Sequence, residues 1–233
     1  MIVRRLRINF ILVLVSFLAV LAGCAGSATE EAAEVAEPVS TPEAVESTTA
    51  VLNPNRATDE ELLGLPHLEE ALVAAILEQR PFLSMTDLDA LLGESLSQEQ
   101  QAELYVQLFV PMNLNTTAEE DFQLVPGVGS RMAHEFEEYR PYDGIERFRR
   151  EIAKYVDEAE VARLEQYVFV PIDLNSASDQ EILGIPGVGE RLLHEFKEYR
   201  PYSSLEQFRR EIGKYVDEKE LSRLERYVTL QSD

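Results

Sequence analysis

Two short glycine segments are the residues of this chain best suited to chemistry. Gly127-Val128-Gly129 and Gly187-Val188-Gly189 each follow a proline, and an arginine, Arg131 or Arg191, stands two residues after the second glycine. Glycine permits positive φ and brings backbone N–H groups to the surface. A helix that begins there adds unpaired N–H groups and a partial positive charge. Such a turn could hold one phosphate oxygen without reading a base. The simpler alternative is that the glycines only allow a tight turn between packed helices.

The densest basic clusters are a second candidate for phosphate contact. They consist of Arg149, Arg150 and Lys154, and of Arg209, Arg210 and Lys214. Glu146 stands four residues before Arg150, and Glu206 stands four residues before Arg210. Oppositely charged residues at this spacing pair on the surface of a helix. We therefore favour a solvated helix face over a phosphate track.

No spacing in the chain is typical of a catalytic or metal centre. His134 and His194 occupy equivalent positions, each within His-Glu-Phe, and no further ligands are apparent beside them, so both are expected on helix surfaces. The single cysteine excludes a disulfide framework and a Cys-rich zinc site. Nucleotide-binding and hydrolase motifs are absent from the sequence. The sequence predicts a non-enzymatic protein that needs no metal or cofactor.

The overall charge argues against a generic basic nucleic-acid binder. The 233 residues include 43 acidic and 21 basic ones, for a net charge of −22. The apolar share of 45% is that of a globular protein.

The N-terminus carries a predicted export signal. Arg4, Arg5 and Arg7 precede an apolar segment, residues 8–21, that is too short to span a bilayer. Leu21-Ala22-Gly23-Cys24 then resembles a bacterial lipobox. That resemblance implies a signal peptide over residues 1–23, cleavage before Cys24 and lipidation of Cys24. The expected location is the cell envelope, at the outer membrane or outer surface, with the lipid on Cys24 holding the protein to the membrane.

Residues 24–50 are predicted to be a disordered acidic tether. From Ala25 to Ala50 the chain has no aromatic and no basic residue, and it has six glutamates. Such a segment cannot bury enough apolar surface to offset its ordering entropy.

From Val51 onward, the chain consists of three copies of one unit. Pro66, Pro126 and Pro186 recur at a spacing of 60 residues, as do Asn55, Asn115 and Asn175, and Arg80, Arg140 and Arg200. This period defines a first repeat (51–110), a second repeat (111–170) and a third repeat (171–233). The second and third are identical at more than half of their positions.

Each repeat is predicted to contain four short helices. In the third repeat, Ser178, Ser204 and Asp217 are expected to cap helices, and Pro186-Gly187 and Pro201 interrupt the chain between them. Between these breaks, Leu192, Phe196 and Tyr199 follow the helical period and are expected to face inward. No segment alternates convincingly at period two. The predicted fold class is all-α.

The repeated pattern resembles the tandem helix-hairpin-helix domain of ComEA-type competence proteins. It is carried by Leu174-Asn175-Ser176, Pro186-Gly187-Val188-Gly189 and Glu198-Tyr199-Arg200, with close counterparts in the second repeat. The resemblance implies three helix-hairpin-helix domains in an elongated array. It also implies sequence-independent binding of double-stranded DNA, with phosphate contacts at residues 127–129, Arg131, residues 187–189 and Arg191.

Several segments depart from this pattern. The first repeat has Pro66-His67-Leu68-Glu69 at the hairpin and Asp89-Ala90 where the others have Arg-Arg, so it is not expected to bind DNA. Later in the repeats, where a second Gly-x-Gly is expected, Ser97, Asp157 and Asp217 should cap the next helix and engage its N–H groups. A second hypothesis is therefore an interaction scaffold or structural subunit at the cell envelope that does not bind DNA and that could dock a protein partner through its first repeat.

Overall fold

The computed structural model describes residues 50–230. The predicted signal peptide, Cys24 and the predicted tether, apart from Ala50, lie outside the described residues. Between residues 50 and 230, no helix has both the length and the hydropathy needed to cross a bilayer. This part of the chain is mostly helical with a few two-residue strands, in agreement with the all-α prediction.

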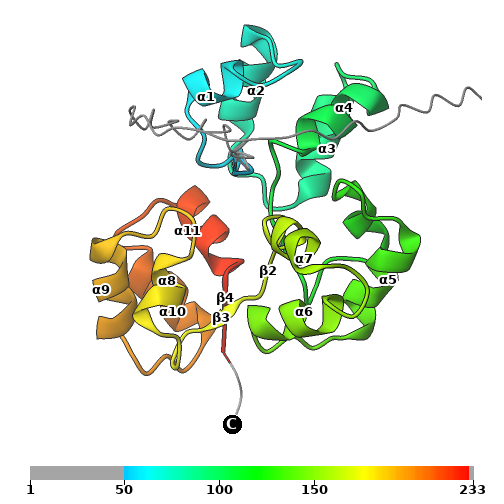
Figure 1. Cartoon of the computed structure of the whole chain (residues 1–233). Coiled ribbons are helices and arrows are strands. Elements are labelled where there is room, and N and C mark those ends of the chain that lie inside the picture. Colours follow the sequence, from blue (N-terminus) through cyan, green and yellow to red (C-terminus); the bar gives the residue numbers. More distant parts are fainter. Residues whose placement is uncertain (1–49, 231–233) are drawn as a thin grey trace, which may run out of the picture. The chain divides into compact units, whose positions relative to one another are not determined.

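Four helical segments lie in each repeat of the described chain (Figure 1). In the first repeat they are α1 (Asp59–Leu63), α2 (Glu70–Gln79), α3 (Met85–Gly93) and α4 (Gln98–Tyr105). In the second they are the 3-10 helix η1 (Glu120–Leu124), α5 (Ser130–Glu138), α6 (Ile145–Ile152) and α7 (Glu158–Glu165). In the third they are α8 (Asp179–Leu183), α9 (Glu190–Glu198), α10 (Leu205–Ile212) and α11 (Glu218–Glu225).

The predicted capping residues begin the helices of the third repeat. Ser178 accepts the Glu181 N–H at α8, and the Glu181 side chain bonds back to the Ser178 N–H. Ser204 and Asp217 accept N–H groups at α10 and α11. On α9, Phe196 is buried, and Leu192 and Tyr199 are half-buried and packed against the core, as predicted. Leu193 is also buried, so the inward face is wider than predicted.

The first helical segment of the second repeat is a 3-10 helix rather than an α-helix. Thr58 and Ser178 cap the equivalent helices α1 and α8, but the corresponding residue here is Ala118. No side chain caps η1. Without a capping hydroxyl, the segment folds into the tighter 3-10 turn, a form common at helix ends and in short connectors.

Short parallel strands close each repeat on itself, and the sequence prediction missed them. Strand β1 (Met112–Asn113) pairs with β2 (Val168–Phe169), and β3 (Ile172–Asp173) pairs with β4 (Val228–Thr229). In the first repeat, Leu52 forms an isolated parallel bridge with Leu108. The beginning and end of every repeat therefore lie side by side (Figure 1).

The asparagine and arginine that recur with the repeat have structural roles. Asn115 exchanges two hydrogen bonds with the backbone of Tyr142, at 2.9 and 2.7 Å. Arg140 donates to the carbonyl oxygens of Leu114 and Thr117, just before η1. Asn55, Asn175 and Arg200 make equivalent contacts with the backbone of their own repeats. Arg80 donates to the Ala57 carbonyl alone, and its Nε is buried without a partner in the described chain. These residues fix the segment that enters each repeat to the segment that follows its second helix.

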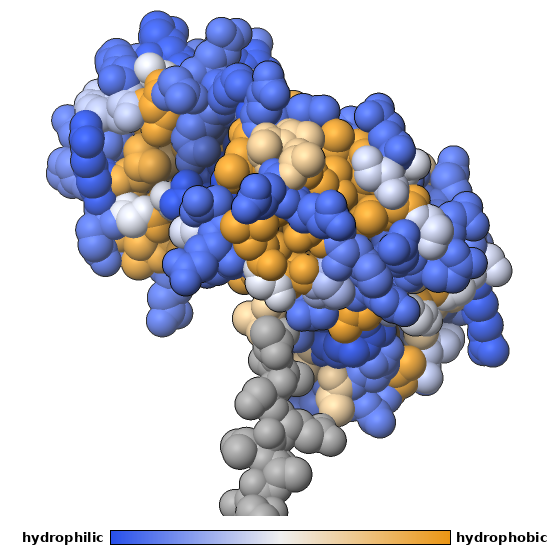
Figure 2. All heavy atoms as spheres, turned by 90° about the horizontal axis from the view of Figure 1, so that it is seen from above, coloured by the Kyte–Doolittle hydropathy of each residue, from blue (hydrophilic) through white to orange (hydrophobic). Residues whose placement is uncertain are grey.

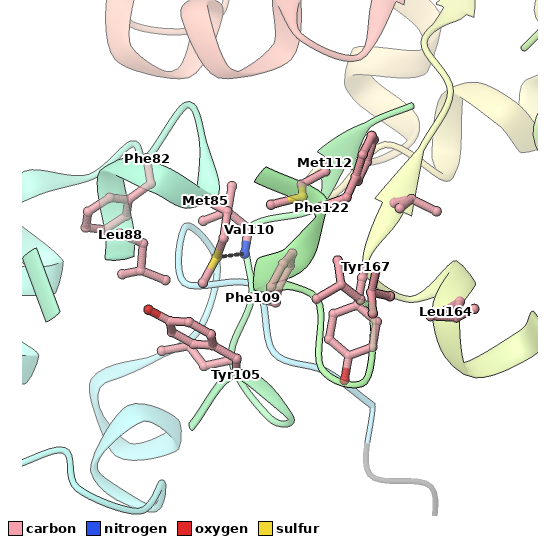
Figure 3. Close-up of a cluster of buried hydrophobic side chains, with 14 of the residues drawn as sticks. Phe82, Met85, Leu88, Tyr105, Phe109, Val110, Met112, Phe122, Leu164 and Tyr167 are labelled. Carbon is pink, nitrogen blue, oxygen red and sulfur yellow. Dashed lines mark hydrogen bonds between the residues drawn. The ribbon is translucent and has the colours of Figure 1, made fainter. Parts of the chain in front are cut away.

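The first two repeats share one continuous apolar core, and the third has its own. At the junction, Phe109 packs edge-on against Tyr167 with ring centroids 5.0 Å apart (Figure 3). The Val110 N–H lies 3.4 Å from the Met85 sulfur. The Phe-Val-Pro joins therefore belong to the core and its strands, and they leave little slack between the first two repeats.

Candidate nucleic-acid interface

The two glycine turns have nearly the same backbone geometry. In the second-repeat turn (residues 126–129), the Val128 N–H donates to the Val125 carbonyl at 3.0 Å and Gly127 has φ of +79°. In the third-repeat turn (residues 186–189), the Val188 N–H donates to the Ile185 carbonyl at 3.0 Å and Gly187 has φ of +84°. Proline followed by a residue at positive φ is the pattern of a type II turn, so the first glycine of each pair is required by the backbone.

The second glycine of each turn has a different role. Gly129 and Gly189 adopt extended backbone, with φ of −93° and −110°, as the N-cap residues of α5 and α9. Both glycines are exposed, whereas the side chains of Val128 and Val188 are buried in the core. The valine N–H is committed to the turn, so a bound anion would have to use N–H groups of the glycines and of the first helical turn.

The starts of α5 and α9 lack a side-chain cap. Neither helix has a side-chain hydrogen bond at its N-cap residue. By contrast, Ser97, Asp157 and Asp217 accept the N–H of the third helical residue of α4, α7 and α11. The structure thus confirms that the start of the last helix in each repeat is capped by its own side chain. The N–H groups after the two glycine turns remain available to solvent.

Arg131 and Arg191 are exposed residues of the first turns of α5 and α9. Neither forms an ion pair with any carboxylate in the described chain, and the Arg191 guanidinium lies 5.8 Å from the centre of the Tyr215 ring. In the third-repeat turn, Glu190 precedes Arg191 and places a carboxylate in the first helical turn. An unpaired arginine beside free N–H groups could contact the same anion.

The six residues of the basic clusters are neutralised. Arg149 pairs with Glu146 and with both oxygens of Glu165, and Arg209 pairs in the same way with Glu206 and Glu225. The remaining pairs are Arg150 and Lys154 with Glu151, and Arg210 and Lys214 with Glu211.

The predicted partners within these clusters were wrong. Glu146 and Glu206 pair three residues along, with Arg149 and Arg209, rather than four residues along, with Arg150 and Arg210. The reason is that Arg149 and Arg209 also reach a carboxylate on the next helix, Glu165 or Glu225, and this orients them toward the nearer glutamate. The conclusion that these clusters form solvated, paired helix faces is unaffected.

The turn of the first repeat keeps its shape without glycine. His67 has φ of +63°, and its Nε2 lies 2.7 Å from the Glu103 carboxylate. Glu69 is the N-cap residue of α2, but its side chain makes no capping hydrogen bond. The histidine therefore tolerates a left-handed backbone conformation that glycine adopts in the other repeats.

The two glycine turns differ in their surroundings. A cavity of about 600 Å³ lies between the second-repeat turn and the first repeat, and its lining includes Asp89, Gln101 and Tyr105. Asp89 accepts a 2.5 Å hydrogen bond from the Tyr105 hydroxyl. Burial and this carboxylate raise the pKa of Tyr105 well above its usual range. The second-repeat turn therefore faces a carboxylate of the first repeat.

A tyrosine pair beside each glycine turn was missed by the sequence analysis. The hydroxyl oxygens of Tyr139 and Tyr155 are 2.8 Å apart, and those of Tyr199 and Tyr215 are 2.9 Å apart. Hydrogen bonds to Glu135 and to Tyr139 raise the pKa of Tyr155 above its usual range. The first repeat has Gln79 and Ser95 at the equivalent positions. Comparing the repeats for residues that occur only with the glycines could have revealed this cluster.

The histidines lie on helix surfaces, as predicted, but both have carboxylate neighbours that were not expected. His134 Nδ1 is 3.1 Å from Glu119 and its Nε2 is 3.9 Å from Glu138. His194 Nε2 is 3.3 Å from the Glu198 carboxylate, and Glu195 offers another carboxylate oxygen within 4.8 Å of both. His194 and Glu198 are both exposed, and ion pairs of this kind are common on helices without a metal.

Comparisons with known proteins give no further guidance. No protein-family model matches the chain, and neither a curated protein nor a solved structure matches it.

Proposed function

We propose that this chain is a lipid-anchored, non-enzymatic protein of the cell envelope that binds double-stranded DNA without sequence specificity. In this proposal its three repeats are helix-hairpin-helix units resembling those of ComEA-type proteins. The repeats do not form the elongated array expected from the sequence, because Arg56 of the first repeat lies against Gly187 of the third. Phosphate contacts are made at the second- and third-repeat turns and by Arg131 and Arg191, with no metal or cofactor.

One contrast supports this proposal above all. The six arginines and lysines of the clusters on α6 and α10 and the residues after them are paired with carboxylates. Arg131 and Arg191 have no such partner in residues 50–230, and they follow exposed glycines and uncapped helix starts. Free N–H groups and an unpaired guanidinium are what a phosphate oxygen requires.

The net charge of −22 sets the conditions for a test. Binding through a few phosphate contacts falls steeply with salt, so retardation of duplex DNA should be measured from about 20 mM salt upward. We expect the purified full-length chain to retard DNA at the lowest salt. Combining Gly127→Glu with Gly187→Glu should abolish this retardation, because two carboxylates would lie where phosphates bind.

A matched control separates charge from backbone strain. Gly127 and Gly187 both have positive φ, so any side chain strains them. Gly127→Ala combined with Gly187→Ala brings the same strain without the charge and should retain part of the binding. If the wild-type chain does not retard DNA even at about 20 mM salt, the DNA proposal is wrong.

A second candidate function is a scaffold that docks a protein through the first repeat. Six large apolar side chains are exposed in the described chain, and Leu63, Leu77, Leu83 and Val106 of the first repeat account for most of them. Figure 2 shows apolar areas between hydrophilic side chains on one face of the molecule. Exposed apolar side chains suit a protein interface better than they suit DNA. If DNA binding is unchanged when these exposed apolar residues of the first repeat are replaced by alanine, they serve the scaffold function and not DNA binding.

The membrane anchor is tested separately. Cells expressing the chain are grown with a radioactive fatty acid, and the purified protein is examined for label. We expect label on the wild-type chain and none on Cys24→Ala. Label on the variant would contradict lipidation at Cys24 without bearing on DNA binding.

A further inference from the structure

An arginine of the first repeat lies against the third-repeat turn. A Cβ placed on Gly187 would be 2.8 Å from the Arg56 Cζ and 2.9 Å from its Nε and Nη1. Arg56 is exposed, and no carboxylate within the described chain pairs with it. The first repeat, which has no glycine turn of its own, thus places a free guanidinium beside the glycine turn of another repeat.

The equivalent place at the second-repeat turn is filled differently. A Cβ on Gly127 would be 3.3 Å from Nη2 of Arg163, which belongs to the same repeat. Arg163 donates two hydrogen bonds to Glu160, at 2.7 and 2.6 Å. Its charge is therefore already matched by a carboxylate. The two turns have the same backbone but different surroundings. The second-repeat turn faces Asp89, whereas the third-repeat turn has Arg56 beside it and Glu190 in the first turn of α9.

Arg223 in the third repeat corresponds to Arg163 and is almost completely buried. Its side chain is 2% exposed, against 31% for Arg163. It donates to Glu220 through Nε and Nη2, at 2.8 and 2.7 Å, but its Nη1 is buried without a hydrogen-bond partner. Arg223 occupies the position in the third repeat that Arg163 occupies in the second, and its charge is likewise matched by a glutamate. The guanidinium that distinguishes the third-repeat turn is therefore that of Arg56.

We propose that the third-repeat turn is the principal phosphate site, and that Arg56 of the first repeat completes it. The inference rests on the proposed DNA binding and adds to it the role of the first repeat. A phosphodiester oxygen would accept from the Arg56 guanidinium and from the N–H groups after Gly187. The second-repeat turn, which faces a carboxylate, contributes less.

The decisive measurement is retardation of duplex DNA by the full-length chain carrying Arg56→Ala. Loss of one charged hydrogen bond should weaken binding about tenfold. It should also reduce the slope of log affinity against log salt by about 0.9, the value for one phosphate contact. Arg150→Ala is the control, because it removes the same charge from an exposed arginine already paired with Glu151. We expect this control to bind DNA like the wild type.

The outcomes separate this inference from the proposed function. If the wild-type chain binds DNA and Arg56→Ala binds as tightly as Arg150→Ala, the inference is wrong and the proposed function stands. Tighter binding by Arg56→Ala would also overturn it, because Arg56 would then obstruct the turn. If the wild-type chain binds inorganic phosphate but no DNA, the assignment to duplex DNA fails together with the proposed function.

A second pair of variants tests the ranking of the turns. Gly127→Glu and Gly187→Glu introduce the same side chain at the same backbone conformation, so their backbone strain is matched. The Cβ on Gly187 must in addition displace Arg56, and Gly127→Ala and Gly187→Ala measure that steric difference without the charge. Gly187→Glu should weaken DNA binding at least fivefold more than Gly127→Glu, with circular dichroism used to check that both remain helical. An equal loss, or a larger loss from Gly127→Glu, would contradict the ranking.

Discussion

Asn175 and Tyr202 are joined by a closed pair of hydrogen bonds. The Asn175 side-chain amide donates to the Tyr202 carbonyl at 2.9 Å, and the Tyr202 N–H donates to the Asn175 Oδ1 at 2.7 Å. Both other repeats contain the same pair, at Asn55 with Phe82 and at Asn115 with Tyr142. A single side chain thus completes the hydrogen bonding of a backbone segment 27 residues away.

Replacing Asn175 should destabilise the third repeat. Asn175→Ala leaves the backbone N–H and carbonyl of Tyr202 without partners in a half-buried place, so the free energy of unfolding should fall by about 2–3 kcal/mol. Asn175→Asp keeps the acceptor and loses the donor, and its loss should be smaller. Urea unfolding followed by circular dichroism checks this order. A stability of Asn175→Ala equal to that of the wild type would show that water replaces both bonds.

Removing the cap of α8 should weaken its start and change the acid response. Hydrogen bonds from the Ser178 hydroxyl and N–H lower the pKa of Glu181. A lowered pKa stabilises the folded state above the ordinary glutamate range, and this stabilisation is lost as pH falls through the folded pKa. Ser178→Ala should cost about 1 kcal/mol near neutral pH and raise the pKa of Glu181. Thermal unfolding at several pH values checks the cost, and Ser178→Thr should retain the cap, as Thr58 does in α1.

His134 should titrate above the usual histidine range. A hydrogen bond with Glu119, 3.1 Å from Nδ1, raises its pKa, and nearby Glu138 and Glu135 raise it further. A raised pKa means that the pairing stabilises the fold fully below the ordinary histidine pKa and is lost as pH rises through the folded pKa. Nuclear magnetic resonance titration of the ring protons measures this directly. In Glu119→Gln the pKa of His134 should decrease, and no decrease would exclude Glu119 as the main cause.

Removing a neutralised cluster should leave DNA binding unchanged. Arg209 and Arg210 pair with Glu225 and Glu211, so they offer no unmatched charge to a phosphate. Arg209→Ala combined with Arg210→Ala should retard duplex DNA at the same protein concentration as the wild type, at about 20 mM salt. A large loss would show that these arginines exchange their glutamate partners for phosphates, and that the clusters form part of the binding surface.

The helix starts could be predicted from the sequence because they depend on local chemistry. Ser178, Ser204 and Asp217 each bond an N–H only three residues along the chain. The exception is η1, where the prediction of four similar helices overlooked Ala118 at the capping position. The residue at this capping position therefore decides between an α-helix and a 3-10 helix. The similarity of the repeats at their other positions concealed this difference.

The strands and the Arg56 contact could not be predicted because they join distant segments. A two-residue strand is too short to show alternation, and Met112 pairs with Val168 only after the repeat has folded. The contact of Arg56 with Gly187 links the first repeat to the third, and nothing in the sequence near either residue indicates it. The sequence therefore predicted the two glycine turns, Arg131 and Arg191. It did not predict which residues of the other repeats lie beside them.

The pairing of each repeat's first and last segments has a mechanical consequence. Ile172 and Leu174 in the entering segment donate to Tyr227 and Thr229 in the leaving segment, both at 2.9 Å, and the strands run in parallel. When the chain is stretched from its two ends, parallel terminal strands are sheared along their length rather than peeled apart. Both hydrogen bonds then bear the tension together. The hydrogen bonds between the first and last segments of a repeat must therefore break before its helices can unfold.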